Sequence, residues 1–142
     1  MPGARGDFVG HIIPAVFVAE NSISGTDVVV WEAPARCILA DLDSTGTAAV
    51  VFSQIGVSST TTVGAVQLRQ ITAGTGNLLS TAVTGVQTGA VASNPTVATS
   101  GVVSTTESAI IIEYGETVQL NVSTAFADTT GSVVVIAYFI GI

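Results

Sequence analysis

The sequence contains no lysine and little charge of either sign. Its 142 residues include three arginines and ten acidic residues, so the formal net charge at pH 7 is −7. Proteins that bind nucleic acids neutralise phosphates with clustered basic side chains, and this composition excludes such a surface. Charged residues make up 9% of the chain, against about a quarter in ordinary soluble domains. Because so few charges cover a small domain, we expect the protein to associate with itself.

The chain also lacks the residues that build metal sites and disulfides. It has one cysteine, Cys37, and one histidine, His11. A structural zinc site needs four such ligands and a disulfide needs two cysteines, so one chain can form neither. Cys37 lies in an apolar segment and is expected in the core. No serine or cysteine nucleophile accompanies His11, so we expect a surface or interface histidine, no enzyme activity and no cofactor.

Long hydrophobic runs are missing as well. The longest, residues 133–142, is about half the length that crosses a bilayer as a helix, and we expect it to form a buried strand. Residues 12–19 are apolar, but Asp7 interrupts the basic region before them. Phe17 occupies the position at which signal peptidase requires a small residue. We therefore expect neither a membrane span nor a secretory signal.

The residues that are abundant belong to β-sheets. Valine, isoleucine and threonine are interspersed with fifteen glycines, and helical periodicity is broken nearly everywhere. Turn residues recur every eight to twelve positions, which predicts an all-β, single-domain β-sandwich or jelly roll with at most one helical turn. A long loop is expected at 89–104. Strands are expected at 28–32, 37–42, 47–53, 63–71, 77–81, 83–87, 109–114, 117–123 and 132–140.

The strand expected at 117–123 has the clearest pattern. Val118, Leu120 and Val122 alternate with polar residues, so these three side chains should face the core. Alternation is weaker at 63–71, where we expect Gln67 and Arg69 to face outward.

The N-terminal segment differs from the rest of the chain. We expect residues 1–26 to form an extended arm and linker, followed by the β-sandwich domain at 27–142. Residues 8–19 are apolar and contain Pro14, which fits an edge strand added to a neighbouring molecule. The candidate interface residues are Phe8, Val9, His11, Ile12, Ile13, Val16 and Phe17.

Two pairs of acidic residues are candidate sites. Asp41 and Asp43 precede Gly46 with the spacing that begins a calcium loop, but its later carboxylates are missing, and a polar turn also explains them. Glu113 and Glu116 could pair as general acid and base, but a sugar-cleaving site also needs aromatic platforms, so a solvated turn is favoured.

Three parts of the sequence together resemble a known group. They are the segment Trp31-Glu32-Ala33-Pro34-Ala35, the step Gly115-Glu116-Thr117-Val118-Gln119-Leu120, and the apolar C-terminal strand. Residues 28–142 thereby resemble the small jelly-roll proteins that decorate the capsids of tailed bacteriophages, often as trimers related in shape to the tumour-necrosis-factor fold. The resemblance implies a cement protein that is made in the host cytoplasm, binds the major capsid protein and stabilises the virion surface.

Two other functions remain open. In an extracellular filament subunit, the N-terminal arm would complete a neighbour's sheet by strand donation. A fibre head that binds carbohydrate or a receptor would need aromatic side chains in its loops, whereas Trp31 falls at the end of an expected strand.

Overall fold

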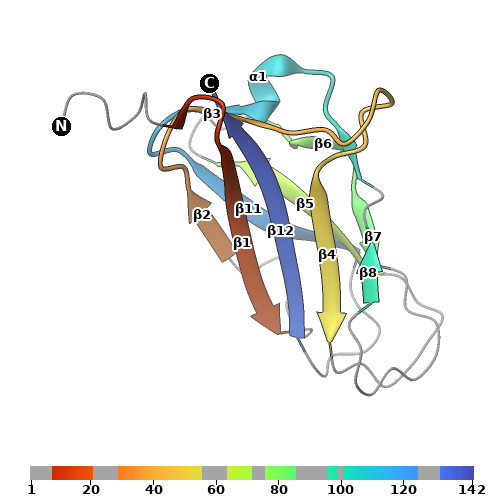
Figure 1. Ribbon diagram of the computed structural model, residues 1–142. Coiled ribbons are helices and arrows are strands. Elements are labelled where there is room, and N and C mark those ends of the chain that lie inside the picture. The colour runs from red at the N-terminus through yellow and green to blue at the C-terminus, as the bar shows by residue number, and fades with distance from the viewer. Residues whose placement is uncertain are drawn as a thin grey trace.

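The described part of the chain folds into β-strands and a short helix (Figure 1). The computed structural model describes residues 8–20, 29–55, 64–71, 76–85, 96–98, 101–124 and 132–142. The all-β prediction is confirmed, and the helix in the described part, α1 (Glu107–Ile110), is four residues long. The strands are β1 (Ile12–Glu20), β2 (Val29–Glu32), β3 (Cys37–Leu39), β4 (Val50–Ile55), β5 (Gly64–Gln70), β6 (Leu79–Thr81), β7 (Val83–Gly85), β8 (Thr96–Ala98), β9 (Val102–Val103), β10 (Ile111–Ile112), β11 (Thr117–Thr124) and β12 (Ser132–Gly141).

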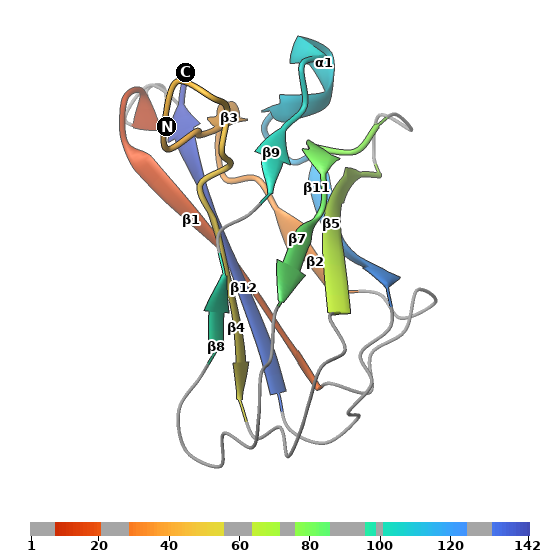
Figure 2. The same cartoon turned by 90° about the vertical axis from the view of Figure 1, so that its right-hand side faces the viewer.

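The strands form two main layers with the core between them (Figure 2). The six-stranded sheet has the order β10-β3-β12-β4-β8, and β1 also pairs with β12. The four-stranded sheet has the order β2-β11-β5-β7, and β6 pairs with β9 in a small third sheet. Trp31 of β2 stacks on Phe139 of β12 with ring centroids 5.1 Å apart, and this contact joins the layers across the core.

Residues 12–20 belong to the sheet and do not form an arm. Strand β1 pairs antiparallel with β12 along its whole length, from Ile12 opposite Ile140 to Glu20 opposite Ser132. Phe17 is completely buried in the chain's own core. The expectation of a docking arm is therefore wrong for this segment, because its alternating apolar residues fill the domain's own interior. The rest of the expected arm and linker, residues 1–7 and 21–26, lies outside the described residues.

The predicted register of β11 is confirmed, since Val118, Leu120 and Val122 are all buried. Two other expectations are wrong. Residues 107–110 form α1, and only Ile111–Ile112 of the strand expected at 109–114 pair, with β3. The segment expected to be a loop at 89–104 contains β8, which pairs with β4, and β9, which pairs with β6. The local composition of this segment did not reveal these pairings.

Gln67 was expected to face solvent, but its side chain is buried. Its Nε2 donates to the carbonyl of Leu79 at 2.9 Å, and its Oε1 accepts from the amides of Leu68 at 3.0 Å and Leu79 at 3.1 Å. The side-chain amide thus takes the place of a peptide group between β5 and β6. Burial of this polar group is possible because its hydrogen bonds are made inside the protein.

If β1 is part of the core, Phe17→Ala should lower the free energy of unfolding by about 3–5 kcal/mol, since a large buried ring is removed. The matched control is the next residue, Val18, which is 62% exposed, and Val18→Ala should change stability by less than about 0.5 kcal/mol. Denaturant titrations measure both values. Equal effects would contradict the placement of β1.

Candidate interaction surface

The outer face of the six-stranded sheet is apolar where β1 and β12 lie side by side. The side chains that alternate away from the core form cross-strand pairs on this face. These pairs are Ile12 with Ile140, Pro14 with Tyr138, Val16 with Ile136, and Val18 with Val134. Apart from the hydroxyl of Tyr138, these eight side chains carry no polar group.

The same face continues across the neighbouring strands. Ile140 pairs with Ile38 of β3, and Ile38 pairs in turn with Ile111 of β10. With Ile12 they make a row of isoleucines across β10, β3, β12 and β1. Farther along β12, Ile136 pairs with Val51 of β4. We call the apolar outward side chains of this sheet the outer face; they are Ile12, Pro14, Val16, Val18, Ile38, Val51, Ile111, Val134, Ile136, Tyr138 and Ile140. Glu20, at the end of β1, alternates to the same side of the sheet and lies opposite Ser132.

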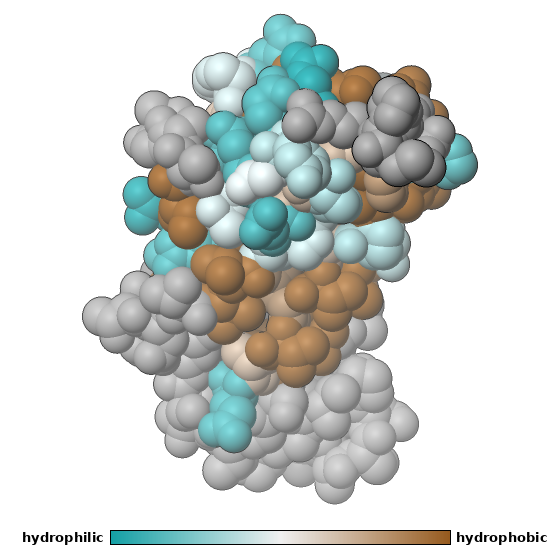
Figure 3. Space-filling view, turned by 90° about the vertical axis from the view of Figure 1, so that its left-hand side faces the viewer, coloured by the Kyte–Doolittle hydropathy of each residue, from teal (hydrophilic) through white to brown (hydrophobic). Residues whose placement is uncertain are grey.

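The outer face is uncovered within the described part of the chain. Ile12 is 69% exposed and Val16 is 50% exposed, and Ile140 is exposed as well. Viewed toward the edge formed by β1 and β2, the molecule shows hydrophobic side chains gathered in the middle of this side (Figure 3). Sheets that are apolar on both faces are normally covered on both. Large exposed apolar patches of this kind mark contacts with other molecules.

Of the residues predicted for an interface, Phe8, Val9 and His11 precede β1, and the other four divide between its two faces. Val9, His11, Ile12 and Val16 are exposed, and Phe8 is half-buried. Ile13 and Phe17 point into the core, so their assignment to an interface is wrong.

Sequence reasoning missed the contribution of β12 to the outer face. The apolar residues at both odd and even positions of 133–142 were the available signal, because a strand with one solvated face alternates in polarity.

Asp43 holds a turn together through both of its carboxylate oxygens. Oδ1 accepts from the amide and hydroxyl of Thr45 at 2.9 and 2.7 Å and from the amide of Thr47 at 3.1 Å. Oδ2 accepts from the hydroxyl of Thr47 at 2.8 Å. These bonds, those from the Thr45 hydroxyl first, lower the pKa of Asp43 to about 2. Asp41 forms an antiparallel bridge with Ala48 in the same turn. Both carboxylate oxygens of Asp43, the other candidate calcium ligand, accept hydrogen bonds from the chain itself.

Glu113 and Glu116 are likewise engaged in a turn. An oxygen of the Glu116 carboxylate accepts from the amide of Glu113 at 2.8 Å, and Gly115 between them has a φ of +79°. The Nε of Arg36 donates to the Glu113 carboxylate at 2.9 Å, in an ion pair that is about half exposed. Both carboxylates thus have partners in or beside the turn: that of Glu116 accepts from the backbone, and that of Glu113 pairs with Arg36.

Cys37 is buried at the start of β3, as expected. Burial, and to a lesser extent the negative charge of Glu113, raises the pKa of its thiol to about 12. The thiol is therefore protonated at neutral pH and is a poor nucleophile.

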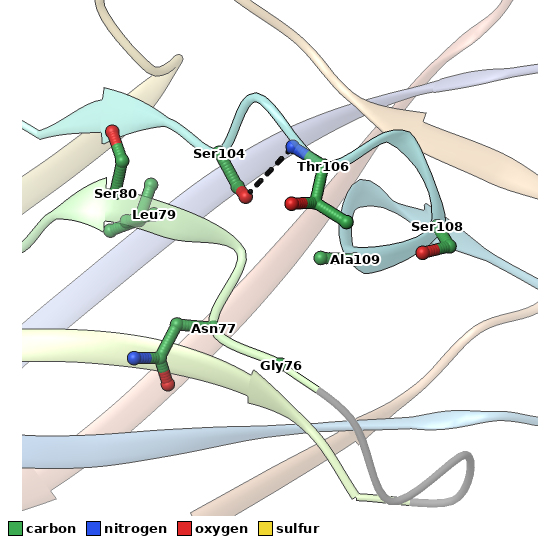
Figure 4. Close-up of a pocket in the computed structure, with 8 residues that line it drawn as sticks. All are labelled: Gly76, Asn77, Leu79, Ser80, Ser104, Thr106, Ser108 and Ala109. Carbon is green, nitrogen blue, oxygen red and sulfur yellow. Dashed lines mark hydrogen bonds between the residues drawn. The ribbon is translucent and has the colours of Figure 1, made fainter.

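A shallow cavity of about 350 Å³ lies where α1 approaches β6 (Figure 4). The Oγ of Ser104 accepts from the amide of Thr106 at 3.2 Å in its wall. No charged or aromatic side chain lines this cavity, so it offers no acid, base or stacking surface for a ligand. The lining residues are Gly76, Asn77, Leu79, Ser80, Ser104, Thr106, Ser108 and Ala109.

Comparison of the chain with protein-family models, curated proteins and solved structures finds no match. In the described part, no helix is long and apolar enough to span a membrane. Nor do three or more His, Cys, Asp or Glu side chains cluster there in a way that could hold a metal ion.

The turn at Asp43 predicts a dependence of stability on pH. The pKa of Asp43 is lower in the folded protein than its ordinary value of 3.8, so the carboxylate stabilises the fold above about pH 4. This contribution should disappear as the pH falls from about 4 to about 2. Asp43→Asn should therefore melt at a lower temperature than wild type at pH 7, and the difference should shrink toward pH 2.

The matched control is Asp41→Asn, which leaves the four hydrogen bonds of Asp43 in place and should melt like wild type across this range. Melting curves followed by circular dichroism measure the difference. A drop in melting temperature on adding a chelator at pH 7 would show instead that Asp41 and Asp43 bind a metal ion.

Proposed function

We propose that this protein is a structural virion protein that decorates and cements the capsid of a tailed bacteriophage, with itself and the major capsid protein as partners. The order of strands supports a jelly-roll sandwich, since β1-β12-β4-β8 face β2-β11-β5-β7. Successive segments of the chain pass between these sheets, as they do in a jelly roll built from two Greek keys. This connectivity supports the jelly-roll resemblance of residues 28–142 and adds β1 to it.

The observation that carries the proposal is the exposed apolar outer face, with Glu20 at its end as the charged residue of β1. Ile12, Val16 and Val18 are each at least half exposed. Their complete burial against a shell would contribute roughly 3–5 kcal/mol before the costs of association. A protein that binds only the assembled shell stabilises it by mass action, without any reaction. The carboxylates, the thiol and the cavity described above fit this role, because each serves the fold or lacks reactive groups.

The filament alternative needs a different use of β1. Strand donation would require β1 to leave β12 and insert into a neighbour, because β1 already completes the sheet of its own chain. The outer face favours decoration, since it contacts a partner without unfolding any part of the domain.

Shells assembled from the major capsid protein encoded in the same genome provide a test. Wild-type protein should co-sediment with these shells and raise their disruption temperature. Ile12→Lys places a charge at a 69% exposed position of the outer face and should weaken binding at least about tenfold.

The matched control is Leu42→Lys, at a 59% exposed position in the turn of Asp43, and it should bind like wild type. Circular dichroism checks that both variants fold. Failure of the wild-type protein to bind shells would refute the decoration function, and fibres of the purified protein in negative-stain micrographs would favour the filament subunit.

A further inference from the structure

The outer edge of β1 has free backbone groups within the described part of the chain. The amide of Gly141 donates to the carbonyl of His11 at 3.0 Å, which fixes the direction of the peptide groups along β1. Because these directions alternate, odd-numbered residues bond to β12 and even-numbered residues point their amides and carbonyls away from it. The strand β12 is the one described partner of β1, so a second strand can pair along this edge.

Pro14 fits this free edge. It is even-numbered, so the amide hydrogen that proline lacks would have pointed away from β12. The other even-numbered residues, Ile12, Val16, Val18 and Glu20, keep their donors. One donor is therefore missing from an otherwise complete edge, and no lysine or bulge protects it in the described part of β1.

We propose that this edge pairs with the β1 edge of a second copy of the chain, antiparallel and across a two-fold axis at Val16. This register overlaps the whole strand, because Ile12 of one copy then faces Glu20 of the other. Val16 faces its own symmetry mate, and each Pro14 faces Val18 of the partner subunit, where one of the two ladder hydrogen bonds still forms. The two prolines never face each other.

In this register, charge does not prevent a second copy from being the occupant. Each chain has a net charge of −7, which opposes association unless the contact keeps like charges apart. Glu20 is the charged residue of β1, and in this register it lies beside the neutral Ile12 of the partner subunit. The two Glu20 residues are about 27 Å apart at ~3.4 Å per residue, well beyond the Debye length of about 8 Å.

The pairing extends the proposed function, and its role in capsid decoration rests on that function. Residues that face each other in an antiparallel pair have their side chains on the same side of the sheet. The six-stranded sheets of both copies therefore join into one sheet, and their outer faces form a single apolar surface for the shell. The contact itself needs no shell and forms in the purified protein.

Cysteine cross-linking tests the register in the purified full-length protein, with Cys37→Ala as the background. Val16→Cys places two thiols on facing residues whose Cα atoms are about 5.5 Å apart, within the range of a disulfide. Mild oxidation should convert this variant to a covalent dimer of twice 14.2 kDa. The matched control is Val18→Cys, which is similarly exposed, but its two thiols lie about 14 Å apart in this register and should stay unlinked.

Mass photometry of wild-type protein should show dimers or larger even-numbered assemblies. Monomers, trimers or equal cross-linking of both variants would overturn the two-fold pairing. Monomers would indicate that Pro14 prevents another strand from pairing with this edge. These results concern the pairing alone and do not decide whether the protein binds shells. Conversely, a cross-linked dimer that does not bind shells would refute decoration and keep the pairing.

Discussion

The fold and its candidate surfaces depend on the antiparallel ladder between β1 and β12. This ladder sends Ile13, Ala15 and Phe17 into the core and turns Ile12 and Val16 outward. Within the described part of the chain, it also leaves the other edge of β1 without a partner strand. A shift of one residue would exchange the two faces, so the burial of Phe17 fixes which side chains any partner meets. The inner packing of β1 and the surface that it presents are two consequences of one register.

The shortage of charge has its structural counterpart in this sheet. On most antiparallel sheets the solvated face carries polar residues, but here the outer face has valines, isoleucines, a proline and a tyrosine. The few charged residues with described contacts serve turns instead, as Asp43 does through its bonds to Thr45 and Thr47. The described turns therefore hold charged side chains such as Asp43, whereas the outward side of β1 is apolar up to Glu20 at its end.

The polar residues inside the domain have structural roles. Gln67 replaces peptide hydrogen bonds between β5 and β6, and Gln70 donates through its Nε2 to the carbonyl of Ile111. These amides connect β5 of the four-stranded sheet to β6 of the small sheet and to β10 of the six-stranded sheet. Both side-chain amides can be buried because their hydrogen bonds are made inside the protein.

The sequence by itself determined the all-β class, most of the strands, the inward face of β11 and the turns at Asp43 and Glu116. These features follow from local patterns, since the alternation around Leu120 and the turn residues act over a few positions. Only the tertiary structure decided that β1 completes its own sheet, that Gln67 is buried, and that Ile136 shares a face with Val16. Each of these depends on pairing between distant segments, and an apolar strand has the same local pattern whether its own chain or a neighbour covers it.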